Sequence, residues 1–173
     1  MMYLIEPHPD DVFMSLHAHI TTLWKDIPKT IVTVTGSGDR IKEAEDYARS
    51  VGCLYMSLGY EDSNWGSSNI PRELSIGHDD PEHQFIFPLG LRHPDHKRVA
   101  ELAPKSALFY LDAYYVQCET NGELPQALHG RAIQSALWAS ESKRYYLSRF
   151  TSQAVRFMLA QPNYPPRFEL VVK

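Results

Sequence analysis

Residues 2–12 read MYLIEPHPDDV, and within this stretch the hydrophobic pattern changes its period. Met2 to Ile5 is a short apolar run typical of a strand, and it ends at Glu6-Pro7. From Asp11 onward, apolar residues recur at helical spacing until Pro28 stops the run. We therefore expect a strand, a short polar connection and a helix, with the polar connection at the carboxyl end of the strand.

The alternation of strand and helix patterns continues along the chain. Further strand-type runs cover Thr30 to Val34, Cys53 to Leu58, Gln84 to Pro88, Ala107 to Asp112 and Arg167 to Val172. Helical spacing covers residues 41–51, 94–103, 132–146 and 152–159. Such an order predicts an α/β fold with a mostly parallel sheet covered by helices. No internal boundary interrupts it, so residues 1–173 are expected to form a single domain.

Composition argues against several classes of protein. The net charge is -4 and the pI is about 6.0, with Lys and Arg scattered, so no nucleic-acid surface is evident. No apolar run approaches the length of a membrane span, and the first residues lack the basic flank of a signal peptide. Cys53 and Cys118 show no motif spacing, which favours a reducing compartment. We expect a cytoplasmic protein, and the sequence does not indicate its oligomeric state.

The tripeptide His-Pro-Asp occurs twice, as His8-Pro9-Asp10 followed by Asp11 and as His93-Pro94-Asp95 followed by His96. Each copy follows a predicted strand and precedes a predicted helix, where proline suits the first helical position. Either copy alone is typical of a capped helix start. Because the carboxyl ends of parallel strands meet at one edge of a sheet, the two copies together indicate one shared site.

The residue types in these copies suit a divalent metal ion. His8, Asp11 and His96 would form a His₂Asp set that leaves one coordination position open, as in catalytic zinc sites. Ferrous iron suits the same ligands. Asp10 and His93 then remain beside the metal as a candidate base and acid, and Asp95 can orient a neighbouring imidazole.

The two copies resemble the motifs of the LmbE-like, or PIG-L, family of metal-dependent N-acetylglucosaminyl deacetylases. That family carries Pro/Ala-His-Pro-Asp-Asp-Glu early and His-x-Asp-His later. The corresponding segments here are Pro7-His8-Pro9-Asp10-Asp11-Val12 and His93-Pro94-Asp95-His96. Weaker similarities run through the rest of the chain, at Arg40, Leu58-Gly59, Asp62, Lys143, Ser152-Gln153 and Phe168-Glu169.

The resemblance implies a Rossmann-like three-layer sandwich and a role for each motif residue. The implied zinc ligands are His8, Asp11 and His96. Asp10 would be the general base that takes a proton from the attacking water. His93 would stabilise the oxyanion or protonate the leaving amine, with Asp95 behind it. Arg40 and Asp62 would contact the substrate, an N-acetylglucosamine-type sugar or small glycoconjugate.

The chain departs from the family pattern at Val12, which replaces the glutamate that follows the paired aspartates. Two other functions therefore stay open: hydrolysis of a different amide or ester with the same metal chemistry, and a non-catalytic module that binds metal or carbohydrate. The presence of Asp10 and His93 disfavours the second, because metal binding alone needs neither residue.

Residues 59–82 are polar and rich in Gly, Ser, Asn and Pro, and so long a loop inside a compact domain is usually functional or mobile. Its aromatic residues Tyr60 and Trp65 either anchor the loop or stack on a sugar ring. His17 and His19 lie in the first predicted helix, where we expect a place on the surface or behind the site rather than a role as ligands.

Overall fold

The computed structural model describes residues 1–77, 79–112, 131–138 and 168–173. The strands in these ranges are β1 (Met2–Glu6), β2 (Lys29–Thr35), β3 (Leu54–Tyr60), β4 (Gln84–Pro88), β5 (Leu108–Tyr110), β6 (Ile133–Trp138) and β7 (Phe168–Val172). The helices are α1 (Asp11–Ala18), its π-helical continuation η1 (His19–Leu23), α2 (Gly38–Ser50) and α3 (Pro94–Glu101). None of the helices in these ranges has the length and apolar character needed to cross a membrane.

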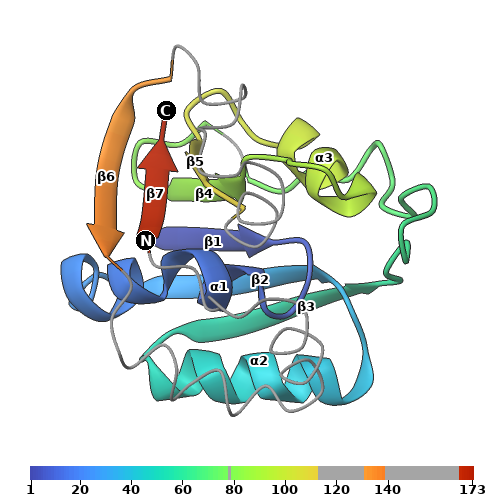
Figure 1. The fold of residues 1–173 in the computed structure, drawn as a ribbon, viewed down its shortest axis with the longest axis horizontal. Coiled ribbons are helices and arrows are strands. Elements are labelled where there is room, and N and C mark those ends of the chain that lie inside the picture. Colours follow the sequence, from blue (N-terminus) through green and yellow to red (C-terminus); the bar gives the residue numbers. More distant parts are fainter. Residues whose placement is uncertain (78, 113–130, 139–167) are drawn as a thin grey trace.

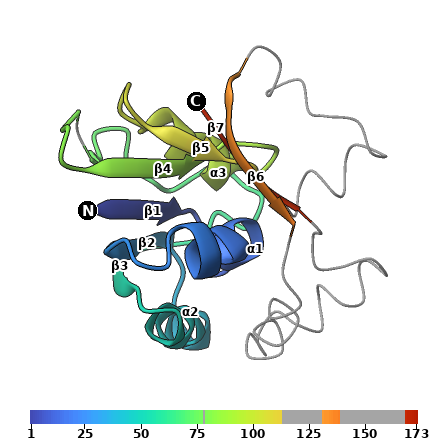
Figure 2. The same ribbon diagram turned by 90° about the vertical axis from the view of Figure 1, so that its left-hand side faces the viewer.

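The seven strands form one sheet in the order β3-β2-β1-β4-β5-β7-β6 (Figure 1). Strands β1 to β5 pair with one another in parallel. Strand β7 lies between β5 and β6 and is antiparallel to both (Figure 2). The predicted α/β fold with a mostly parallel sheet is confirmed.

The helices cover both faces of the sheet and make it the middle layer of three. Leu4 and Ile31, paired across β1 and β2, pack in the same core cluster as apolar residues of α1 and α2. Their neighbours Ile5 and Val32 point the other way and pack in a second cluster with Val99 of α3. Successive residues of a strand face opposite sides, so α1 and α2 lie on one face and α3 on the other.

The winding of the sheet changes direction at the carboxyl ends of β1 and β4. These strands are neighbours in the sheet, although β2 and β3 lie between them in sequence. The chain leaves β1 for α1 on one face and leaves β4 for α3 on the opposite face. This is the topological switch point at which open α/β sheets bind ligands.

The junction of α1 with η1 is held by a buried carboxylate from β7. Glu169 accepts hydrogen bonds from the backbone amides of Ala18 and His19 at 2.9 and 3.1 Å, and its Oε2 lies 3.1 Å from the His19 ring. The ring of His17 lies 3.0 Å from the hydroxyl of Tyr47. Both histidines are buried, so a surface position for them is wrong.

One predicted helix is also wrong. The spacing of apolar residues predicts a helix over residues 132–146, but Ile133–Trp138 forms strand β6. This strand pairs antiparallel with β7, from Ile133↔Val172 to Trp138↔Phe168. Residues such as Gln, Ala and Leu favour a helix locally, and pairing with a distant strand overrides that preference. Residues 139–146, the helix predicted over 152–159 and Cys118 lie outside the described residues.

Candidate metal and catalytic site

The loop that carries the first His-Pro-Asp motif is fixed against the end of β2. Thr35 donates to the carbonyl oxygen of Pro7 twice, from its amide at 2.9 Å and from its hydroxyl at 2.7 Å. Next to it, Gly36 has φ +125°, and a Cβ there would lie 2.7 Å from Cγ of Pro9. Glycine is therefore needed at this position, because it permits both the backbone conformation and the close approach of Pro9.

The second motif begins α3. His93 is the N-cap residue, and its Nδ1 accepts a hydrogen bond from the backbone amide of Asp95 at 3.3 Å. Pro94 occupies the first turn, where its missing N–H has no cost. Because Nδ1 of His93 is an acceptor, the neutral ring carries its proton on Nε2.

The two motifs meet at this switch point. Nδ1 of His8 lies 3.3 Å from Oδ2 of Asp11 and 3.2 Å from Nε2 of His96. Nε2 of His96 lies 3.1 Å from the same oxygen of Asp11. Tetrahedral zinc ligands at about 2.0–2.2 Å from the ion are separated by roughly 3.3–3.6 Å, so these three atoms are close to the spacing a zinc ion requires.

Mutual attraction keeps these groups charged despite their burial. Burial opposes ionisation of Asp11, but His96 and His8 outweigh it and hold the pKa of the carboxyl well below its usual range. Burial likewise opposes protonation of His96, yet Asp11 and Asp112 raise the pKa of this imidazole to about 9. A cation bound here would take the place of the imidazole protons, and Asp11 is already the carboxylate that such a cation needs.

Each imidazole of this set also faces a buried carboxylate on its other side. Nδ1 of His96 lies 2.7 Å from Oδ1 of Asp112, whose Oδ2 accepts from the amide of Leu91 at 2.8 Å. Nε2 of His8 lies 3.4 Å from Oδ2 of Asp95. Such carboxylates fix the orientation of metal-binding imidazoles. Asp112 was not singled out from the sequence, although it is an acid at the carboxyl end of a predicted strand, the same end at which both motifs lie.

Asp10 lies next to the three ligand atoms without joining them. Its Oδ1 is 3.3 Å from the guanidinium of Arg40, and its Oδ2 is buried and has no hydrogen-bond partner among the described residues. Burial raises the pKa of Asp10, although the charge of Arg40 opposes the shift. Arg40 also lies 3.3 Å from Asp62, so the two residues expected to contact substrate stand together beside Asp10.

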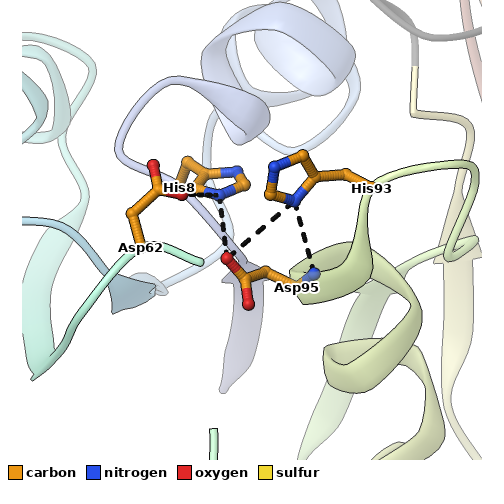
Figure 3. Close-up of side chains that lie close together, drawn as sticks. All are labelled: His8, Asp62, His93 and Asp95. Atoms are coloured by element: carbon orange, nitrogen blue, oxygen red, sulfur yellow. Dashed lines mark hydrogen bonds and ion pairs between the residues drawn. The ribbon is translucent and has the colours of Figure 1, made fainter. Parts of the chain in front are cut away.

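His93 packs its ring against the metal-binding set from the side of α3. The ring centroids of His93 and His8 are 4.7 Å apart at an interplanar angle of 84°. Figure 3 shows both rings above Asp95, with Asp62 reaching in from the loop after β3. Burial, together with the charges of His8 and His96, lowers the pKa of His93 to about 4. His93 is therefore a neutral imidazole near pH 7.

A second group of metal-binding residue types shares His8 and consists of His8, Asp62, His93 and Asp95. Its carboxylates already have partners. Asp95 accepts from the amide of Ser63 at 2.9 Å and from the hydroxyl of Ser68. Asp62 accepts from the amide of Asn64 at 2.8 Å. The carboxylate of Asp11 likewise accepts from the amide of His8 at 2.8 Å, so both groups hold ligand-type atoms close together and share His8.

A buried glutamate lies beneath the site, and it was not expected from the sequence. Glu6 accepts from the amide of Val12 at 2.9 Å and from the hydroxyl of Thr33. Burial raises its pKa to about 8, against the opposing hydrogen bonds from Thr33 and Val12. The carboxyl group of Glu6 thus accepts from the backbone of Val12, the position at which the LmbE-like motif has a glutamate.

No family model matches the chain, and no curated protein sequence matches it. Several solved structures match its fold. The A40926 pseudoaglycone deacetylase Dbv21 has a TM-score of 0.61 at 15% identity, over 99% of this chain and 95% of that one. A deacetylase in complex with teicoplanin has a TM-score of 0.59 at 16% identity, over 99% of this chain and 98% of that one. The N,N'-diacetylchitobiose deacetylase from Pyrococcus horikoshii has a TM-score of 0.53 at 16% identity, over 98% of this chain and 82% of that one. The shared fold is the one that the sequence resemblance implies.

Proposed function

We propose that this chain is a metal-dependent deacetylase that hydrolyses the N-acetyl group of an N-acetylglucosamine-type sugar or conjugate. One observation carries the proposal: the two imidazoles and the carboxylate meet at 3.1–3.3 Å, with Asp10 and His93 beside them. A purely structural metal site would have a fourth protein ligand and would need neither neighbour. The fold shared with three deacetylases supports the same conclusion.

His8, Asp11 and His96 would hold the cation, which we propose to be zinc, with ferrous iron as the alternative. Two nitrogen ligands and one oxygen ligand suit both metals. When bound, the cation would polarise the amide carbonyl and make a water molecule more acidic.

Asp10 would act as both base and acid. Within the part of the chain that the structure describes, its buried Oδ2 has no hydrogen-bond partner, so this oxygen can accept a proton from the attacking water. Its raised pKa then favours keeping that proton until the C–N bond breaks, when Asp10 returns it to the amide nitrogen. The products are acetate and the free amine, and Asp10 ends in its starting state.

His93 would donate a hydrogen bond to the carbonyl oxygen as that oxygen becomes negative. The resemblance left two roles open for His93, and its lowered pKa favours the donor over the acid. The hydrogen bond from the Asp95 amide to Nδ1 places the proton of the neutral ring on Nε2, the nitrogen that we propose to face the substrate. Donors positioned before the reaction stabilise the transition state without reorganisation.

Arg40 and Asp62 would bind the sugar hydroxyls. A paired guanidinium and carboxylate offer both donors and acceptors, which a hydroxyl group can use together. The solved structures with this fold include deacetylases named for teicoplanin and N,N'-diacetylchitobiose, which supports a sugar or glycoconjugate here.

A substrate panel tests the proposal against its alternatives. Purified metal-loaded protein is incubated with N-acetylglucosamine, N,N'-diacetylchitobiose, a nucleotide-linked N-acetyl sugar, an acyclic acetamide and an acetate ester, and acetate is measured. Release from the sugars above the other two supports a sugar deacetylase. Release only from the acyclic amide or the ester indicates another hydrolase, and no release indicates a binding module.

A further inference from the structure

We propose that Trp65 forms a stacking platform for the pyranose ring of the substrate at the mouth of the site. The inference deepens the proposed function, because it names the residue that would select a ring-shaped sugar over an acyclic amide. It rests on the conformation of the turn that carries Trp65, the anchors of that turn, and the place of the indole beside His93.

Trp65 sits in a turn whose backbone is costly for its residue types. The amide of Gly66 donates to the carbonyl oxygen of Ser63 at 2.8 Å, and the two central residues, Asn64 and Trp65, have φ of 47° and 70°. Asparagine tolerates the left-handed region, but a bulky residue such as tryptophan rarely adopts it. Such a conformation is unfavourable for a bulky residue and persists where the surrounding structure imposes it.

Two carboxylates of the candidate site impose this turn. Asp95, fully buried at the start of α3, accepts from the amide of Ser63 at 2.9 Å. Asp62 accepts from the amide of Asn64 at 2.8 Å. The loop is therefore tied to the same elements that place His8 and His93, and the position of the indole is fixed relative to the reacting groups.

The indole is the outermost of three rings that lead from the metal-binding set to the surface. His93 is 4.7 Å from His8 on one side and 4.7 Å from Trp65 on the other, with the indole inclined at 70°. His93 is 3% exposed, whereas Trp65 is 50% exposed. A tryptophan that served packing alone would have most of its surface covered, whereas half of this side chain is accessible to solvent beside His93.

The geometry of an N-acetyl sugar matches this row of rings. Its carbonyl carbon must lie beside His93, and that carbon is joined to the pyranose ring through the amide nitrogen alone. The sugar ring therefore lies just outside His93, where the indole is. One face of a pyranose carries mainly C–H groups, which pack on an aromatic face, while its hydroxyls point outward from the ring edge toward Arg40 and Asp62.

The test compares Trp65→Ala and Trp65→Tyr with the control Met56→Ala. Met56 is a matched apolar side chain, 51% exposed in the middle of β3 and outside the site. All are made in the metal-loaded full chain carrying Asp10→Asn to prevent turnover. Binding of N-acetylglucosamine and of N-acetylethanolamine is measured by calorimetry, and circular dichroism verifies the fold.

We expect Trp65→Ala to weaken sugar binding roughly 10-fold, in line with the loss of one aromatic contact, and Trp65→Tyr to retain most of it. The acyclic amide should bind all variants equally. Sugar binding in Trp65→Ala equal to that of Met56→Ala would overturn the proposal, as would a wild-type chain that binds no sugar. The proposed function is tested separately, by acetate release from the chain with Asp10 intact. If sugar binding depends on Trp65 but that chain releases no acetate, deacetylation is refuted and the role of Trp65 in sugar binding is not.

Discussion

Oδ1 of Asp112 lies 2.7 Å from Nδ1 of His96, and this contact turns the other nitrogen of the ring toward Asp11. Asp112 follows β5 and His96 belongs to α3, so the pair joins two separate elements behind the metal-binding set. The contact fixes which nitrogen of His96 can bind a cation.

Asp112→Asn should therefore weaken zinc binding roughly 10–100-fold, because the amide holds His96 less firmly and lacks the charge that supports it. Competition with a zinc-binding dye measures the affinity. Asp26→Asn is the control, since Asp26 is exposed and pairs only weakly with Lys25 at 4.0 Å. Equal affinities in both variants would show that Asp112 does not position His96.

Asp10→Asn should retain zinc and lose kcat by roughly 100-fold or more, the usual scale for a general base. The amide cannot take a proton from water, whereas the proposed ligands His8, Asp11 and His96 remain intact. Metal content and kcat are measured on the same preparation, with Asp39→Asn on the surface of α2 as control. Wild-type turnover by Asp10→Asn would assign the base to another residue.

His93→Ala should lower kcat by roughly 100-fold with KM little changed, because its hydrogen bond strengthens mainly in the transition state. The pH dependence separates a neutral donor from an acid. With its pKa lowered to about 4, His93 is neutral above that pH, and its contribution is lost only as the pH falls through about 4. The basic limb of the kcat profile should be the same in wild type and in His93→Ala. A basic limb that disappears in the variant would show that His93 acts as a cationic acid.

Glu6 should make the metal-free protein less stable as the pH rises. Its pKa is raised from 4.5 to about 8 by burial, so the folded state binds more protons than the unfolded state between these values. The stabilisation is complete below pH 4.5 and is lost as the pH rises through about 8. Glu6→Gln imitates the protonated acid toward Val12 and Thr33, and it should be more stable than wild type at pH 9 by about 2–4 kcal/mol.

Urea unfolding of chelator-treated protein at pH 5 and pH 9 measures this difference. Glu45→Gln, an exposed change on α2, is the control and should follow wild type. If wild type and Glu6→Gln lose stability equally between the two pH values, Glu6 is ionised in the folded protein.

The sequence predicted the parts of this molecule that depend on local pattern. The strand and helix periods on either side of His8 and His93 were sufficient to place both motifs at strand ends on one edge of the sheet. Strand β6 was missed, because its conformation depends on pairing with β7 at the far end of the chain. Asp112 and Glu169 were not assigned their contacts, because a single acid does not reveal which distant amide or imidazole it meets.

The central claim is that the cation held by His8, Asp11 and His96 is required for deacetylation. Its most direct test measures acetate released from N-acetyl sugars by chelator-treated protein, before and after one equivalent of zinc or ferrous iron is added per chain. We expect no release before addition and full release after it, with no recovery in the double variant His8→Ala, His96→Ala. Acetate release by the metal-free protein, or equal recovery in the double variant, would contradict the account.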